Sequence, residues 1–127
     1  MIRVLIPKDK DFNYKQNKKL YKKYRKEIGD RREFRDIVDE RNAFFFSFYN
    51  DKQYIGFIYF YYENNKLFVN ACANRHTHNI NIECFKKTFE WFSCDIYARS
   101  NHKTAIYCLY KLGFKKIKDG LYIYERS

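Results

Sequence analysis

The sequence predicts one α/β (α+β) domain, in which a sheet packs against several helices. Apolar residues between positions 43 and 73 are grouped as in strands, and polar turns divide this stretch into three segments. On either side of it, apolar residues recur at helical spacing, in residues 20–28, 82–92 and 105–112. A strand-rich centre between helical segments indicates a sheet covered by helices.

The composition indicates a single compact unit. The chain has 127 residues with only 4 Gly and 1 Pro, but 13 Tyr and 13 Phe. This balance argues against disorder and favours long elements joined by short turns. The length suits one hydrophobic core, and no linker interrupts the chain, so we expect residues 1–127 to form one domain.

The charge favours an anionic ligand or partner. Lysine and arginine total 26 against 15 acidic residues, a net charge of +11. Nucleic acid, tRNA, an acidic protein face and a phosphorylated cofactor all fit this charge, and so does a plain solvated basic surface. No apolar run approaches the length needed to cross a bilayer. The apolar start in residues 1–7 is too short for a signal peptide, so we expect a cytoplasmic protein without a membrane partner.

The four cysteines are widely spaced and include no Cys-x-x-Cys pair, so we expect reduced thiols. A metal site made of Cys72, His76, His78 and Cys84 would have a spacing that matches none of the usual zinc patterns. The sequence therefore predicts no metal site.

The N-terminal part predicts a strand followed by a basic amphipathic helix. Residues 2–6 alternate and end at Pro7, and the helix ends at Gly29. Its apolar stripe consists of Leu20, Tyr21, Tyr24 and Ile28. Its basic face consists of Lys15, Lys18, Lys19, Lys22, Lys23, Arg25 and Lys26.

A second, short helix should follow directly. Asp30 and Glu33 have the spacing of a capping box, which would open a helix with Phe34, Ile37 and Val38 turned inward.

The centre predicts an antiparallel meander of three strands, residues 44–49, 54–62 and 67–73. Gly56 lies inside the second strand, where it indicates a bulge or a close backbone approach. As an aromatic-rich outer strand, residues 54–62 could support a homodimer by sheet pairing.

The C-terminal part alternates helices and strands. Ile82, Phe85, Phe89 and Phe92 predict a helix that Asn79 or Asn81 could cap. A strand at residues 95–98 leads into a helix opened by Asn101 and closed by Gly113, and strands follow at 114–118 and 121–125. The apolar face of this last helix consists of Ala105, Ile106, Leu109 and Leu112.

This order of elements resembles the GNAT N-acetyltransferases over nearly the whole chain, most clearly from Phe44 onward. The resemblance implies the GNAT fold, a mixed and mostly antiparallel central sheet flanked by helices on both faces. It also implies acetyl-CoA as co-substrate, bound in a V-shaped opening between residues 67–73 and 95–98, where unpaired strand edges can bond its amide arm.

In that family, backbone N–H groups of a Gln/Arg-x-x-Gly-x-Gly/Ala motif hold the pyrophosphate. Arg75 matches the first position, but His78 and Ile80 replace both glycines. Charge and hydrogen bonds from Arg75, His76 and His78 would have to offset that loss. The cofactor-binding residues that the resemblance implies are Val69, Asn70, Ala71, Arg75, His76, His78, Asn79, Ile80 and Asn101.

The sequence indicates the catalytic residues less clearly than the cofactor-binding residues. Family members usually carry a tyrosine four residues before the helix-ending glycine as the acid that protonates the thiolate, but Leu109 stands there. Tyr110 is the nearest substitute, ahead of Tyr107. Glu63, at the turn of the meander, is the candidate base, with Glu83 as an alternative.

Two functions follow. The first is direct transfer of an acetyl group from acetyl-CoA to an amine of a protein, an aminoacyl-tRNA or a small molecule. The second is a catalytically decayed GNAT-fold binding protein, whose basic helix at residues 15–26 contacts nucleic acid or an acidic protein.

Overall fold

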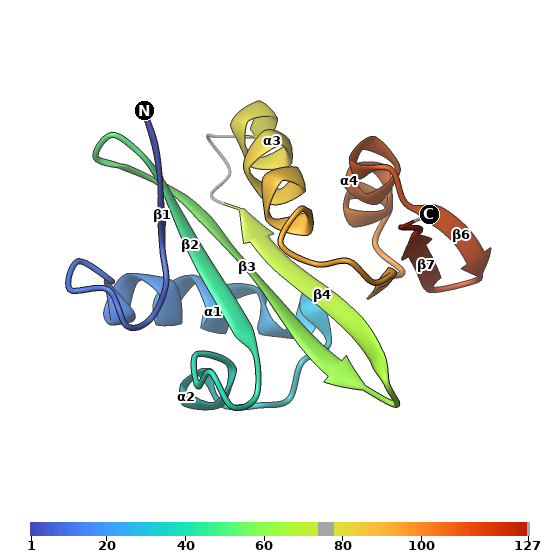
Figure 1. The fold of residues 1–127 in the computed structure, drawn as a ribbon, viewed down its shortest axis with the longest axis horizontal. Coiled ribbons are helices and arrows are strands. Elements are labelled where there is room, and N and C mark those ends of the chain that lie inside the picture. The colour runs from blue at the N-terminus through green and yellow to red at the C-terminus, as the bar shows by residue number, and fades with distance from the viewer. Residues whose placement is uncertain (74–77, 127) are drawn as a thin grey trace.

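The computed structural model describes residues 1–73 and 78–126, and for residues 78–81 it describes the backbone alone. It contains one sheet of seven strands and four helices within these residues (Figure 1). The elements are β1 (Ile2–Leu5), α1 (Tyr14–Ile28), α2 (Phe34–Ile37), β2 (Phe44–Asn50), β3 (Gln53–Glu63), β4 (Lys66–Ala73), α3 (His78–Phe89), β5 (Ile96–Arg99), α4 (Lys103–Leu112), β6 (Lys115–Lys118) and β7 (Leu121–Tyr124).

The sheet is mixed and mostly antiparallel, as predicted. Its strand order is β1-β2-β3-β4-β5-β7-β6, and only β4 and β5 pair in parallel. Strands β2, β3 and β4 form the expected meander. The suggestion that residues 54–62 form an outer strand is wrong, because β3 is paired on both edges and β1 and β6 are the edge strands.

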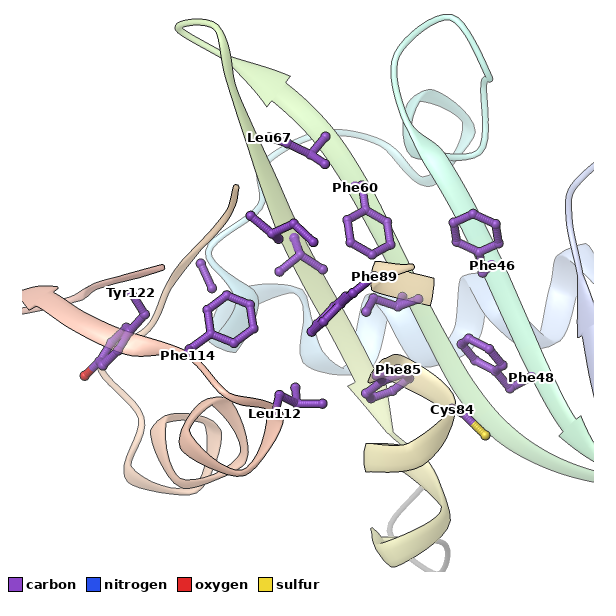
Figure 2. Close-up of a cluster of buried hydrophobic side chains, with 14 of the residues drawn as sticks. Phe46, Phe48, Phe60, Leu67, Cys84, Phe85, Phe89, Leu112, Phe114 and Tyr122 are labelled. Carbon is purple, nitrogen blue, oxygen red and sulfur yellow. The ribbon is translucent and has the colours of Figure 1, made fainter. Parts of the chain in front are cut away.

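Helices cover both faces of the sheet. Neighbouring residues in each strand point to opposite sides, and here the residues on both sides are apolar and pack against helices. Phe45 and Phe57 join a core cluster with Tyr21 and Phe34 from the α1 and α2 side. Their chain neighbours belong to a second cluster on the α3 and α4 side, which Figure 2 shows. That cluster includes Phe46, Phe48, Ile58, Phe60, Leu67, Phe85, Phe89, Leu112, Phe114 and Tyr122.

Helix α1 forms as the amphipathic pattern predicts. The Asn13 side chain accepts a hydrogen bond from the Gln16 backbone N–H, and Gly29 closes the helix in the left-handed conformation. A buried hydrogen bond network, which the sequence did not indicate, also fastens this helix to the sheet. Asn17 is fully buried and accepts hydrogen bonds from the hydroxyls of Ser47 on β2, at 3.0 Å, and Tyr54 on β3, at 2.5 Å.

The predicted helix starts need correction. Asp30 does not cap α2, because its carboxylate accepts the backbone N–H of Arg32, and α2 begins only after Glu33. Helix α3 already includes residues 79 and 81, so neither asparagine precedes it as a cap. Helix α4 starts at Lys103 with His102 at the N-cap position and no side-chain cap, so Asn101 does not open it. Its residue Ala105 is exposed rather than inward.

Gly56 marks both a bulge and a close approach, as predicted. The β2–β3 register shifts beside it, and its φ is +148°. A Cβ at this position would lie 2.3 Å from the carbonyl oxygen of Cys72 on β4. Only glycine allows β3 and β4 to meet this closely.

Candidate active site

The main irregularity of the sheet is an opening between its two parallel strands. Strands β4 and β5 pair at only two positions, Leu67 with Ile96 and Phe68 with Tyr97. Strand β4 continues to Ala73 and stays paired with β3 on its other edge. In Figure 1 its arrow ends near α3, apart from β6 and β7. Within the described residues, the β5-side edge of residues 69–73 therefore has no strand partner, and such an edge is a template for an extended ligand.

Phe89 of α3 joins the two parts of the sheet on one face of this opening. Its ring centroid lies 6.0 Å from Phe60 on β3, 5.7 Å from Phe114 and 5.0 Å from Tyr124 on β7. Figure 2 shows Phe89 between Phe60 and Phe114. The hydrophobic core on this face therefore holds β4 and β5 in place, although the two strands pair at only two positions.

An ion pair crosses β4 on the opposite face. Glu63 at the end of β3 and Arg99 at the end of β5 lie 2.6 Å apart, and the Arg99 guanidinium stacks 3.9 Å from the centre of the Phe68 ring on β4. Because β4 lies between β3 and β5, this pair straddles the narrow end of the opening. It brings a carboxylate and a guanidinium to the place where the two parallel strands separate.

A polar cluster beside the opening fastens the loop between α1 and α2 to the sheet. The Asp30 carboxylate, whose side chain is 6% exposed, accepts hydrogen bonds from Arg32 at 2.8 Å and from the Tyr59 hydroxyl at 2.6 Å. Asn70 donates its side-chain N–H to the Tyr59 oxygen at 3.1 Å. Asn70 belongs to the segment of β4 that is paired with β3 but no longer with β5, so the cluster links that segment to the loop.

Burial and hydrogen bonding oppose each other in this cluster. Burial by itself would raise the pKa of Asp30, but hydrogen bonds from Arg32 and Tyr59 outweigh it and lower the pKa below its ordinary 3.8. Burial, followed by the hydrogen bond to Asp30, raises the pKa of the Tyr59 hydroxyl. Asp30 is therefore a charged acceptor and Tyr59 a neutral donor at neutral pH.

Replacing Asp30 by asparagine should destabilise the fold by about 2–4 kcal/mol, because Arg32 and Tyr59 lose their charged acceptor. A lowered folded-state pKa means that the carboxylate contributes stability above its unfolded pKa, and that this stability is lost as the pH falls through the folded pKa. Urea unfolding at several pH values checks this. The difference in free energy of unfolding between wild type and Asp30→Asn should be largest at neutral pH and should decrease below about pH 4. A constant difference would contradict the role given to the charge.

The structure separates the two predicted catalytic residues. Glu63 lies at the narrow end of the opening in its ion pair with Arg99. Tyr110 is 51% exposed, and its ring packs 5.8 Å from Tyr122 on β7. It thus faces β7 and does not join the residues at the opening. Tyr107 is also exposed, with the Lys111 ammonium over its ring.

The predicted cofactor residues fall into three groups. Residues Val69, Asn70 and Ala71 lie on β4 directly after its last pair with β5. Asn101 lies between β5 and α4 and approaches Gly120 in the turn between β6 and β7. The third group contains Arg75 and His76, which lie outside the described residues, and His78, Asn79 and Ile80, whose backbone forms the start of α3.

Sequence reasoning missed the residues that surround Glu63 and Asn70. Tyr59 had the pattern of any strand residue, Asp30 had the pattern of a helix cap, and nothing in the sequence connects Arg99 with Glu63. The one available signal was Asn70, a polar residue in an otherwise apolar strand. Cys72 and Cys84 belong to the group of four residues that was weighed as a metal site. Their thiols are buried in the two core clusters on opposite faces of the sheet, so the structure does not bring these two cysteines together.

Comparison with known proteins connects this geometry to one fold. No protein-family model matches the chain, and no curated protein matches it either. Solved structures do match, over nearly their whole length. An N-acetyltransferase from Staphylococcus aureus Mu50 superimposes with a TM-score of 0.69 at 17% identity, covering 98% of this chain and 97% of that one. The chain has the GNAT fold.

Two further structures with this fold contain coenzyme A or acetyl coenzyme A. The aminoglycoside acetyltransferase AAC(6')-Ib in complex with coenzyme A has a TM-score of 0.69 at 11% identity, with 99% of this chain and 95% of that chain covered. The Campylobacter jejuni N-acetyltransferase PseH in complex with acetyl coenzyme A has a TM-score of 0.64 at 17% identity, with both chains fully covered at 100%.

Within the described part of this GNAT-fold chain, none of the helices is both long and apolar enough to span a membrane.

Proposed function

We propose that this protein is an acetyl-CoA-dependent N-acetyltransferase that transfers the acetyl group directly to an amine. The observation that carries the proposal is the separation of β4 from β5 after Phe68, which leaves the β5-side edge of residues 69–73 without a strand partner among the described residues. The presence of coenzyme A or acetyl coenzyme A in solved structures of this fold supports it.

In this proposal, the amide arm of acetyl-CoA lies along the free edge of β4. Backbone N–H groups in Val69, Asn70 and Ala71 would support the oxyanion that forms when the amine attacks the thioester carbonyl. The phosphates would lie at the start of α3, with Arg75, His76, His78, Asn79 and Ile80 as the proposed phosphate-binding residues, because the first turn of a helix presents backbone N–H groups to anions. Asn101 borders the same region from the start of α4.

The amine would enter from the face that carries the Glu63–Arg99 pair. Glu63 is the proposed base, acting directly or through a water, because it is the carboxylate at the narrow end of the opening. Tyr110 remains the proposed donor of a proton to the departing thiolate, a role that requires its ring to turn away from Tyr122. The acceptor is an amine of a protein, an aminoacyl-tRNA or a small molecule.

Ligand binding and transfer test the proposal together. The purified protein is examined for bound coenzyme A by mass spectrometry, and its thermal unfolding is followed with increasing acetyl-CoA. A ligand that binds only the folded state stabilises it by about 2.7 kcal/mol at a hundred times its Kd. Thiol release is then measured with amines from each acceptor class. No stabilisation at saturating acetyl-CoA would overturn the proposal.

Replacing Glu63 by glutamine should lower kcat by about 10²-fold if the carboxylate is the base. Stability should change by at most about 1 kcal/mol, because the side chains of this ion pair are half exposed. Arg99→Gln is the matched control, since it breaks the same ion pair and keeps the carboxylate. Equal losses in the two variants would show that the ion pair, rather than a base, matters.

A further inference from the structure

Helix α1 carries a dense positive charge that the acyl-transfer site does not use. Its fifteen residues include six lysines and one arginine against a single acidic residue, Glu27. This helix therefore supplies more than half of the chain's net charge of +11. Its first turn contains no acidic residue that could interrupt the charge.

The lysines form a continuous band on the outer side of the helix. At about 100° per residue, all six fall within an arc of about 140°. Asn17 and Tyr21, which are buried against the sheet, lie on the opposite side. Lys15, Lys19, Lys22 and Lys26 recur at steps of four, three and four residues, so they follow one line about 16 Å long. These four lysines are all exposed.

No carboxylate of the described residues neutralises this band. None of the ion pairs in that part of the chain includes a lysine of α1. Lys18 and Lys23 lie over the rings of Tyr14 and Tyr24, which leaves their charge intact. Arg25 is different, because it turns back and donates hydrogen bonds to the backbone carbonyls of Asp30 and Arg31. The band thus consists of lysines alone.

We propose that this lysine band binds the phosphodiester backbone of a nucleic acid. Duplex DNA carries a negative charge for about every 1.7 Å of its axis, a regular linear array that an uninterrupted line of ammonium groups can neutralise. Compact, mobile ammonium groups suit contacts that do not depend on sequence. The binding is independent of acyl transfer and does not rest on the proposed enzymatic function.

Two other anionic surfaces fit less well. A helix that lies on a membrane buries its apolar face among the lipids, but the apolar face of α1 is occupied by the sheet, with Tyr21 at 1% exposure. An acidic protein partner would form an interface whose core is depleted in lysine and built on apolar anchors, whereas this band consists of lysines and the exposed Tyr14 lies at its edge, under Lys18. The nucleic acid backbone requires no such anchor.

Fluorescence anisotropy of the full chain with labelled probes tests the proposal. The probes are a single-stranded oligoribonucleotide and a DNA duplex, each of about 20 nucleotides per strand. Four phosphate contacts predict a loss of affinity of about 50-fold for the single strand between about 50 and 200 mM salt. The triple variant Lys19→Gln, Lys22→Gln, Lys26→Gln should lower the slope of log Kd against log salt by about 2. A comparison of the two probes tells which form of backbone is preferred.

A control with the same change in net charge separates the band from the overall charge. Lys10, Lys52 and Lys118 are exposed, lie outside α1 and have no ion pair within the described residues, so their replacement by glutamine should leave most of the affinity. Equal losses in both triple variants, or a salt-independent affinity, would overturn the proposal. So would equal or tighter binding of poly-glutamate or of phosphatidylserine vesicles. Circular dichroism of each variant establishes that it is folded.

Discussion

Replacing Gly56 by alanine is expected to destabilise the fold by about 4 kcal/mol or more, at the upper end of what a single substitution does. The added Cβ would lie 2.3 Å from the Cys72 carbonyl oxygen and 3.0 Å from the Ala73 Cα, both backbone atoms of β4. The φ of +148° adds backbone strain for any L residue. Denaturant unfolding measures the loss. If the variant does not fold, its absence from the soluble fraction gives the same answer.

Gly29→Ala is the matched control for this prediction. Gly29 also has a positive φ, of +76°, but a Cβ there would meet no atom within 4 Å. The control should cost only about 1–2 kcal/mol, which is the strain of the left-handed conformation alone. A loss at Gly56 no larger than the loss at Gly29 would show that β3 and β4 can separate without cost, and would contradict the close approach.

Replacing Phe89 by alanine should destabilise the fold by about 3–5 kcal/mol and also weaken acetyl-CoA binding. The ring is 1% exposed and contacts Phe60 on one side of the opening and Phe114 and Tyr124 on the other. A cavity here removes the packing that holds the two parts of the sheet at a set separation. Urea unfolding measures the stability, and calorimetric titration below the unfolding temperature measures the affinity.

The control for this second effect is Phe48→Ala. Phe48 is equally buried at 1% exposure, but it lies on β2, which β3 and β4 separate from β5, and its aromatic contact is Phe85 of α3 (Figure 2). A similar loss of stability with unchanged acetyl-CoA affinity is expected. If both variants lose affinity alike, the effect comes from general destabilisation and the bridging role of Phe89 is wrong.

The elements of this fold could be predicted because local patterns determine them. Residues that alternate or recur every three to four positions must share a face, so the meander and most of the apolar faces of α1, α3 and α4 followed from spacing. The exceptions are Phe92, which lies beyond the end of α3, and Ala105 of α4, which is exposed. Gly29 and Gly113 marked helix ends because a left-handed residue is needed there. Helix starts were less predictable, since the polar residues that can cap a helix also form other local hydrogen bonds. Asp30 is an example, because its carboxylate binds Arg32 instead.

The arrangement of the site could not be predicted in the same way. The contacts of Asp30 with Tyr59 and of Glu63 with Arg99 join residues far apart in the sequence, and they exist only because β3, β4 and β5 become neighbours. The residue at which β4 parts from β5 likewise depends on packing across the whole sheet. Tyr110 was a candidate from its distance to Gly113 alone, and the structure shows that its ring packs on Tyr122.

Amide hydrogen exchange with and without acetyl-CoA tests the central claim, that the cofactor binds along the free edge of β4. Saturating acetyl-CoA should slow exchange in residues 69–73, at the amides that face away from β3, because the cofactor's amide arm replaces water as their partner. Amides of β2, which is paired on both edges, should slow only as far as the stabilisation of the whole fold by the ligand requires. Unchanged exchange in residues 69–73 at saturating acetyl-CoA would contradict the account.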